Sequence, residues 1–230
     1  YGRVARRIMD KRVRKAVDVP VICVGNFTVG GSGKTPTALA LASAAIERGL
    51  KPGFLSRGYG GGVHHATVVD LEKDQALLVV DARRGVGNGC VFPAGPVRAP
   101  VIDQLRHADA LIVVGEGDGA DRMIRLAARA AKPIHLARLQ PRNGAQFRDR
   151  NCLAFAAIGD PEKFFKTLED AHVRLARCKS FPDHHPFTED EIRELLAEAE
   201  LYGLDLITTG KDYVRLQAGH GNAVELVEKT

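Results

Sequence analysis

The feature that most constrains the fold is an apolar run that leads directly into a glycine-rich turn near the start of the chain. The run begins at Val21, and the turn ends in Gly-Lys-Thr at 33–35. Glycines in such a turn let successive backbone N–H groups point into one concavity, and a helix that starts there adds the positive end of its dipole. The arrangement is typical of a P-loop, so it predicts a site for the phosphates of a nucleotide.

Within this loop we expect two residues to have separate roles. Lys34 would neutralise charge on the β- and γ-phosphates and so act in catalysis, and Thr35 would hold Mg²⁺. The strict P-loop pattern has glycine where this chain has Thr28, yet the strand before the loop and the helix after it favour a nucleotide site over a strand–turn–helix without a chemical role. The residues predicted to bind the nucleotide are Thr28, Val29, Gly30, Gly31, Ser32, Gly33, Lys34 and Thr35.

Length, cysteine usage and hydropathy narrow the class of protein. The chain has 230 residues, 45% of them hydrophobic, which is enough to bury a core as one large or two small domains. Its four cysteines are widely spread without C-x-x-C spacing, so we expect reduced thiols and neither a disulfide framework nor a zinc site. No apolar run approaches the roughly 18 residues that span a bilayer, and no signal-peptide pattern is present, so we expect a cytoplasmic protein.

Much of the net charge of +5 lies in a basic segment at the start of the chain, where Asp10 is the one acidic residue among the first 17. Apolar residues recur there near helical spacing, so the segment is either a basic helix on an anionic membrane face or a solvated helix end. Nucleic-acid binding is less favoured, because no aromatic residues or known reader module accompany the charge. The basic residues are Arg3, Arg6, Arg7, Lys11, Arg12, Arg14 and Lys15.

Strand and helix patterns alternate along the whole chain, which predicts α/β layers with a mostly parallel sheet. A strand at 19–25, a helix at 34–48 and a strand at 51–56 have the size of a βαβ unit. The other expected strands cover 76–82, 110–115, 133–139, 152–158, 173–178, 204–208 and 223–227, and the other expected helices cover 103–108, 121–131, 161–171 and 188–202.

A polar stretch at 141–150 suggests a boundary between two parts of the chain. The first part, 1–150, would be the P-loop core lobe with the basic N-terminal helix. The second, 151–230, would be a smaller C-terminal α/β lobe. We therefore expect a P-loop nucleotide-binding core followed by a second α/β unit.

Polar or glycine-rich strings follow several predicted strands, at the edge where parallel α/β sheets place ligands. Asp81 ends a buried strand, a position at which P-loop proteins often hold a metal-binding acid, although the same residue could simply start a turn. The strings are Ser-Arg-Gly-Tyr-Gly-Gly at 56–61, Asp-Ala-Arg-Arg-Gly-Val-Gly-Asn-Gly at 81–89, Pro-Ala-Gly-Pro-Val-Arg at 93–98, Phe-Pro-Asp-His-His-Pro-Phe at 181–187 and Thr-Thr-Gly-Lys-Asp at 208–212.

Together with the P-loop, and in this order, the strings make the chain resemble the tetraacyldisaccharide 4′-kinases of the lipid A pathway. The resemblance runs from about Val19 to Asp212 and includes Thr28, where the strict P-loop pattern fails. It implies transfer of the γ-phosphate of ATP, with Mg²⁺, to the 4′-hydroxyl of a tetraacylated glucosamine disaccharide 1-phosphate. It also implies a lipid substrate, no nucleic acid, and a cytoplasmic enzyme peripheral to the inner membrane.

The resemblance suggests catalytic residues in the second lobe. His184 matches the histidine that the family is thought to use, with an aspartate, to take the proton of the sugar hydroxyl, and Asp183 lies beside it. The alternative for both is a polar turn that leads into a helix. For His185 a catalytic role is less favoured, and a zinc site is disfavoured because no cysteine or further histidine cluster completes it.

Substrate-binding residues are expected in the first lobe. The guanidinium of Arg57 would reach phosphate oxygens, with Tyr59 beside it in a glycine-rich turn. Asn88 and Arg98 would form a floor for the anionic head group of the lipid. The alternative for all of them is a solvated surface loop.

The interval between the 56–61 string and the strand at 76–82 is shorter than in the family. Family members carry Gly-Asp-Glu and Asp-Asp-Gly motifs there, so neither the aspartate partner of His184 nor further acids near Mg²⁺ can be assigned. Ala99 also stands where many relatives have glutamate. Either residues of a longer protein are missing or the deletion is natural and impairs the chemistry. The lack of turn residues at 69–72 favours the first.

Two other functions share the P-loop. A GTPase or metallochaperone-like switch protein would need a guanine-reading N/T-K-x-D string, but at 208–212 the lysine directly precedes the aspartate. A basic membrane-binding or nucleic-acid-binding module with a degenerate nucleotide site becomes a serious alternative if the short interval is natural.

Overall fold

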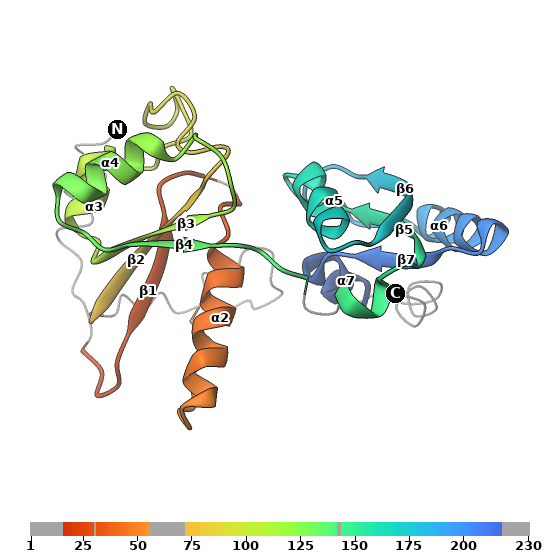
Figure 1. The fold of residues 1–230 in the computed structure, drawn as a ribbon, viewed down its shortest axis with the longest axis horizontal. Helices are drawn as coiled ribbons and strands as arrows, with labels where there is room; N and C mark the ends of the chain where they lie inside the picture. The colour runs from red at the N-terminus through yellow and green to blue at the C-terminus, as the bar shows by residue number, and fades with distance from the viewer. Residues whose placement is uncertain (1–15, 30, 56–71, 142–143, 218–230) are drawn as a thin grey trace. The chain divides into compact units, whose positions relative to one another are not determined.

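The computed structural model describes residues 16–29, 31–55, 72–141 and 144–217. The chain divides into two compact units, Tyr1–Arg138 and Leu139–Thr230. The division falls earlier in the chain than the boundary at 150/151 that the sequence suggested. Each unit contains a parallel sheet with helices, and each is described here by itself (Figure 1).

The first unit contains a four-stranded sheet in the order β1-β2-β3-β4, with every neighbouring pair parallel. Its helices connect successive strands, as the alternation in the sequence predicts. Its strands are β1 (Ile22–Asn26), β2 (Gln75–Asp81), β3 (Ala110–Val114) and β4 (Ile134–Ala137), and its helices are α2 (Lys34–Glu47), α3 (Val101–Arg106) and α4 (Asp121–Arg129).

The partner of β1 differs from the expectation. Residues 51–55 form no strand, and β1 pairs with β2 instead, from Ile22 opposite Gln75 to Asn26 opposite Val79. The prediction of a strand at 51–56 was therefore wrong over its described residues. Apolar residues suggested this strand, but Leu55 is 82% exposed, so that its side chain does not enter the core.

The two faces of the first sheet pack against different helices because successive side chains of a strand point to opposite faces. Leu78 and Val113 share one buried cluster with residues of α3 and α4, including Met123. On the other face, Val114 lies next to Gly33 at the start of α2. Figure 1 accordingly shows α3 and α4 on one side of the sheet and α2 on the other.

The second unit contains a three-stranded parallel sheet in the order β6-β5-β7, so the first of its strands lies in the middle. Its elements are β5 (Asn151–Ala156), α5 (Pro161–Asp170), β6 (Arg174–Ser180), α6 (Glu189–Tyr202), β7 (Asp205–Thr208), α7 (Gly210–Gln217) and a short 3₁₀ helix, η1 (Gly144–Phe147). After β6 the chain passes to the other side of β5 to form β7. Because the strand order reverses at β5, a ligand crevice is expected at the carboxyl end of this strand.

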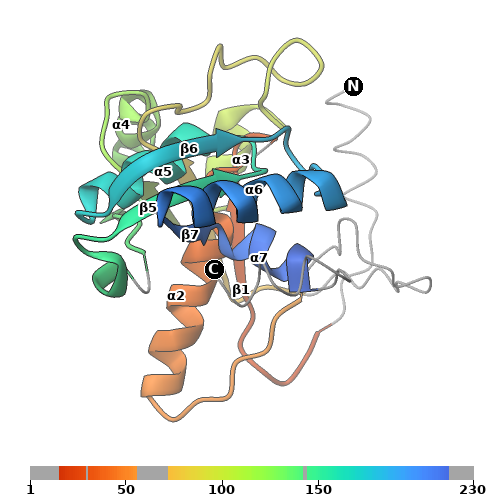
Figure 2. The same cartoon turned by 90° about the vertical axis from the view of Figure 1, so that its right-hand side faces the viewer.

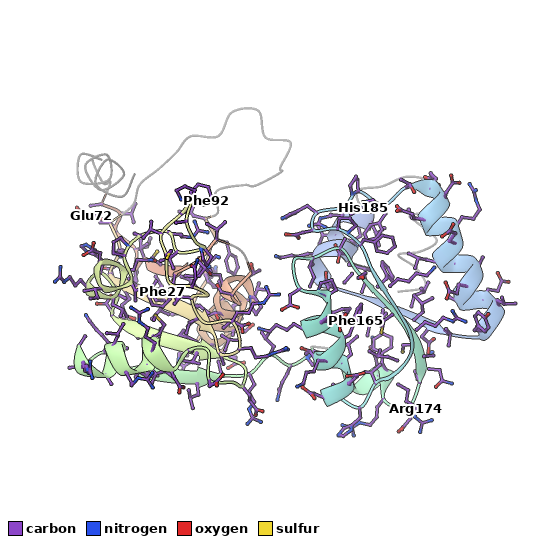
Figure 3. The ribbon with its side chains drawn as sticks, turned by 90° about the horizontal axis from the view of Figure 1, so that it is seen from above. Phe27, Glu72, Phe92, Phe165, Arg174 and His185 are labelled. Atoms are coloured by element: carbon purple, nitrogen blue, oxygen red, sulfur yellow. The ribbon has the colours of Figure 1, made fainter. Side chains whose placement is uncertain are left out.

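Both faces of this central strand are buried. Leu153 and Phe155 pack with apolar residues of α6 and α7, whereas Cys152 and Ala154 pack with α5, including Phe165. Figure 2 shows α6 and α7 near one another, and Figure 3 shows Phe165 within the second unit and Phe27 within the first.

Most of the remaining elements lie close to their expected positions. The capping box predicted for α6 is present, since the Thr188 side chain accepts from the Glu191 N–H and the Glu191 side chain accepts from the Thr188 N–H. Helix α7 was not predicted. The basic segment and the expected strand at 223–227 lie outside the described residues. Within the described part of the chain, no helix is both long and apolar enough to cross a membrane.

Candidate active site

The loop between β1 and α2 begins at a carbonyl that two side chains hold. Asn26 is buried, and its Nδ2 donates to the Thr28 carbonyl at 2.7 Å, while Arg98 Nε donates to the same oxygen at 2.9 Å. Thr28 does not have a positive φ. Glycine is therefore not required at this position, which explains why the loop can begin with threonine.

The end of the loop has the geometry of an anion site. Gly33 has a φ of +90°, a conformation that favours glycine, and a Cβ there would lie 3.3 Å from Val114 Cγ2. Gly33 is also the N-cap of α2 and provides no side-chain cap, and a helix start of this kind is a typical place for an anion to bind. Lys34 and the exposed Thr35 form the start of this helix.

One buried side chain in the loop has no hydrogen-bond partner within the described structure. Among the described residues, Ser32 Oγ is the buried side-chain oxygen or nitrogen that lacks a hydrogen-bond partner. A buried hydroxyl without a partner costs free energy, so a ligand in the loop would relieve the cost. Gly30, predicted to bind the nucleotide, lies outside the described residues.

The Pro-Ala-Gly-Pro-Val-Arg string lies beside the loop, as expected for strings that form one site. The Val29 N–H donates to the Pro96 carbonyl at 2.8 Å, and the Arg98 N–H donates to the Phe27 carbonyl at 2.9 Å. Phe27 is only 1% exposed and anchors this pair of segments in the core. Segments that lie some 70 residues apart in the sequence therefore support each other.

Asp81 and Asn88 both bond to their own loop. Asp81 is buried at the end of β2, and its Oδ1 accepts from the N–H groups of Arg83 and Arg84 at 3.0 and 3.1 Å. Asn88 Oδ1 accepts from the Cys90 N–H, and its Nδ2 donates to the Ala94 carbonyl, both at 3.0 Å. The two bonds of Asp81 agree with the turn role considered for this residue, and the two bonds of Asn88 shape the loop around it. Arg57 and Tyr59 lie outside the described residues.

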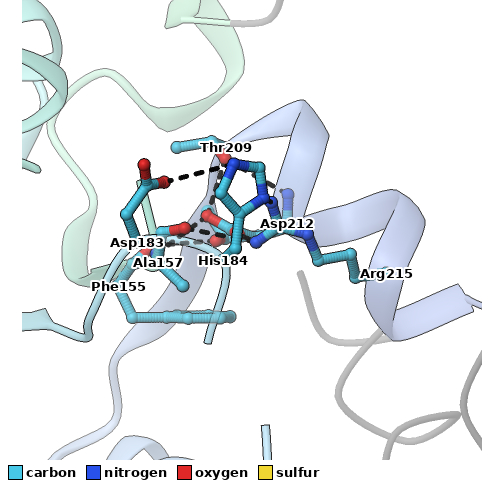
Figure 4. A network of polar contacts seen from close by, with 8 residues as sticks. Phe155, Ala157, Asp183, His184, Thr209, Asp212 and Arg215 are labelled. Carbon is cyan, nitrogen blue, oxygen red and sulfur yellow. Dashed lines mark hydrogen bonds and ion pairs between the residues drawn. The ribbon is translucent and has the colours of Figure 1, made fainter. Parts of the chain in front are cut away.

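In the second unit, a polar network stands at the carboxyl edge of the sheet, just after β5 (Figure 4). His184 has a φ of +62°, which is uncommon for a residue other than glycine, and its N–H donates to the Ala157 carbonyl at 3.2 Å. Asp183 Oδ1 lies 3.8 Å from His184 Nε2, beyond hydrogen-bond distance. Both side chains are more than half exposed, so a ligand could reach them.

Two further residues complete this network, and neither was among the site residues predicted from the sequence. Arg215 donates from one terminal nitrogen to His184 Nδ1 at 2.9 Å and from the other to Asp212 Oδ1 at 2.8 Å. Asp212 is fully buried, and its Oδ2 accepts from the Ala157 N–H and from Thr209 Oγ1. The available signal for Asp212 was its place in the Thr-Thr-Gly-Lys-Asp string at 208–212, and Arg215 lies three residues further along α7.

The burial of Asp212 also bears on the GTPase alternative. In that class the aspartate of the guanine-reading string must meet the base. Here the Asp212 carboxylate has no exposed surface, and Ala157, Thr209 and Arg215 occupy its oxygens. Asp212 therefore stabilises the fold and, through Arg215, holds His184. It is not placed to contact a guanine base.

His185 faces the protein interior, unlike its neighbour. Its ring stacks on Phe181 with centroids 5.5 Å apart, and its Nε2 lies 2.8 Å from the Glu191 carboxylate. The Thr188 N–H and the hydrogen bond with His185 together lower the pKa of Glu191 below its ordinary value of 4.5. His185 thus links the turn to the capping box of α6, which fits the structural interpretation of this residue.

The side-chain oxygens of Thr35 and Asp81, the two residues predicted to hold a metal, fit a magnesium ion better than a transition metal. Hydroxyl and carboxylate oxygens, such as those of Thr35 and Asp81, suit Mg²⁺, which keeps several waters and binds partly through phosphates. Within the described parts of the chain, no group of three or more His, Cys, Asp or Glu residues could hold a metal ion.

Burial raises the pKa of the Cys152 thiol to about 11, so this cysteine is a core residue in its neutral form.

Comparisons with known proteins address the whole chain. A family model described as tetraacyldisaccharide-1-P 4′-kinase matches residues 2–75 and 68–228. The tetraacyldisaccharide 4′-kinases of Sinorhizobium fredii and Rhizobium meliloti are 46% and 44% identical, over 100% of this chain and 82% of theirs. A crystal structure of LpxK from Aquifex aeolicus in complex with ATP has a TM-score of 0.56, with 22% identity over 96% of this chain and 87% of that one.

The same comparisons locate the short interval. Each of these two alignments spans 283 positions, although this chain has 230 residues. The two matches of the family model meet at residues 68–75, within the interval in which the sequence lacks family motifs. The structural match supports the expected α/β fold with a P-loop core, and the sequence matches confirm the resemblance inferred from the strings. The chain belongs to the tetraacyldisaccharide 4′-kinase family.

Proposed function

We propose that this chain transfers the γ-phosphoryl group of ATP to the 4′-hydroxyl of a tetraacyldisaccharide 1-phosphate. The observation that carries the proposal is the geometry of the loop at the start of α2, in a chain of this family. Gly33 leaves the amino end of α2 uncapped, and Ser32 Oγ is buried beside it without a partner in the described structure. Phosphoryl transfer depends on charge neutralisation and positioning, which such a site supplies.

The first unit would hold the nucleotide. The N–H groups of the loop and of the start of α2 would bind phosphate oxygens, and Lys34 would neutralise charge that develops on the transferred group. Thr35 and Asp81 carry the oxygens that would hold Mg²⁺. When bound, Mg²⁺ neutralises charge on the β- and γ-phosphates.

Candidate residues for the acceptor occur in each unit and are proposed for each unit by itself. His184 and Asp183 lie at the carboxyl edge of the second sheet, exposed to a ligand, and would orient the sugar hydroxyl. Arg98 Nε already holds the Thr28 carbonyl, and the rest of its guanidinium would meet the anionic head group. Asn88, Arg57 and Tyr59 remain proposed substrate contacts on the sequence pattern alone. The basic N-terminal segment would add peripheral contact with an anionic membrane face.

The test is incubation of the chain with labelled ATP and a tetraacyldisaccharide 1-phosphate in detergent. Wild type is expected to label the lipid, and Lys34→Ala is expected to lower labelling at least about 100-fold, the order of effect when a phosphate-binding charge is removed. Lys166→Ala is a matched control, because Lys166 is exposed on α5 of the second unit. Unlabelled lipid with wild type would overturn the proposal, and full labelling by Lys34→Ala would reject Lys34 as a phosphate ligand.

A further inference from the structure

The guanidinium of Arg215 reaches three different groups at the carboxyl end of β5 (Figure 4). One terminal nitrogen donates to Asp212 Oδ1 at 2.8 Å and to the Ala157 carbonyl at 3.2 Å, and the other lies 2.9 Å from His184 Nδ1. A guanidinium carries donors and no acceptor. Nδ1 of His184 must therefore accept in this contact, and the proton of the neutral imidazole lies on Nε2.

Arg215 is itself held firmly, so the contact is not that of a freely moving surface side chain. Its partner Asp212 is fully buried and also accepts from the Ala157 N–H at 3.0 Å and from Thr209 Oγ1 at 2.7 Å. The Ala157 carbonyl receives both Arg215 and the N–H of His184. One peptide unit at the end of the central strand thus fixes the guanidinium and the histidine backbone together.

The opposite nitrogen of the ring is available to a ligand. The nearest carboxylate oxygen recorded beside Nε2 is Asp183 Oδ1 at 3.8 Å, which is too long for a hydrogen bond. The His184 side chain is 66% exposed. An Nε2–H in this position would donate to an oxygen acceptor, such as a hydroxyl or phosphate oxygen of the lipid.

We infer that Arg215 is a positioning residue, which fixes His184 as the tautomer with its proton on Nε2. His184 then meets the substrate as a hydrogen-bond donor, because its one lone pair is occupied by Arg215. The catalytic consequence rests on the proposed kinase function, whereas the tautomer does not. A lysine at 215 would keep a positive charge for Asp212 but lacks the fork that can serve Asp212 and His184 at once.

The experiment is two-bond ¹H–¹⁵N correlation NMR of the full chain with ¹⁵N-labelled histidine, at a pH at which the ring is neutral. His184→Gln identifies the signals, and Arg215→Lys tests the contact. Arg193→Lys is the matched control, because Arg193 has the same i,i+3 ion pair with Asp190, at 2.8 Å, on α6. We expect the Nε2–H form in wild type and in the control, and a mixture of tautomers in Arg215→Lys.

Steady-state kinetics with the lipid then test the consequence. Arg215→Lys is expected to lower kcat about 10-fold or more, with KM for ATP changed less than about twofold, since residues that orient a functional histidine have effects of this order. An Nδ1–H form in wild type, an unchanged tautomer in Arg215→Lys, or a changed tautomer with unchanged kcat would each overturn the inference. Absence of kinase activity in wild type would overturn the proposed function instead, and the NMR result would still decide the tautomer.

Discussion

One backbone carbonyl in each unit organises the candidate functional residues of that unit. The Thr28 carbonyl receives the side chains of Asn26 and Arg98, and the Ala157 carbonyl receives Arg215 and the N–H of His184. A carbonyl with two lone pairs can accept from two donors, so each joins segments that are far apart in the sequence. At this scale, the side chains that shape the site matter as much as those that would contact the substrate.

Replacement of His184 tests its role directly. His184→Ala is expected to lower kcat about 100-fold or more, because removal of one positioned hydrogen-bond donor from a reacting group has an effect of this order. KM for ATP should change little, since the nucleotide loop lies in the other unit. Steady-state kinetics with varied ATP and lipid would measure both constants. His135→Ala, at an exposed position of β4, is the control. A rise confined to KM for ATP would contradict the assignment.

The sequence identified the histidine pair but not its partners. Within the pair, His184 has a left-handed backbone and an exposed side chain, whereas His185 packs on Phe181. The sequence of the 181–187 string does not reveal a backbone angle of this kind. Arg215 was missed because its bond to His184 joins residues 31 apart, one in the loop after β6 and the other in α7.

At the scale of elements, local patterns predicted most strands and helices, because buried strands and capped helices leave clear signals. The prediction of a strand at 51–56 was wrong because apolar residues alone do not determine which segment pairs with β1. Pairing is decided by contacts distant in sequence, and β2 took that place. Helix α7 was missed because its eight residues are mostly polar and its start was hidden in the Thr-Thr-Gly-Lys-Asp string.

The capping box of α6 should make stability depend on pH. The folded pKa of Glu191 is lowered, so its carboxylate stabilises the fold above its ordinary value of 4.5, and this contribution is lost as pH falls through the folded pKa. Glu191→Gln should therefore be less stable than wild type by about 1 kcal/mol near neutral pH, the gap between charged and neutral hydrogen bonds. The difference should narrow in acid.

Urea unfolding at several pH values would measure this difference. Glu200→Gln is the control, because Glu200 is exposed in the last turn of the same helix. A difference between wild type and Glu191→Gln that stays constant from neutral to acid pH would show that the charge of Glu191 is not responsible.

At the scale of the whole molecule, the chain has separate cores in its two units. The buried cluster of the first unit contains Leu111, and a cluster of the second contains Leu153; both side chains are fully buried. Each Leu→Ala change should cost about 2–5 kcal/mol through lost burial and the cavity that remains. We expect calorimetry to resolve two unfolding transitions, with Leu111→Ala lowering one and Leu153→Ala the other. Equal shifts of both transitions in both variants would show that the units unfold together.

The passage of the chain across β5 determines in which loops of the second unit this protein can tolerate insertions or deletions. The polar network uses the ends of three strands, whereas the loops at the opposite edge of the sheet contribute nothing to it. Homologues should therefore accept insertions at that opposite edge. A one-residue slip of β7 against β5 would instead turn its side chains to the wrong face and carry Asp212 away from the Ala157 amide, so natural variation in loop length should be scarce between Thr208 and Arg215.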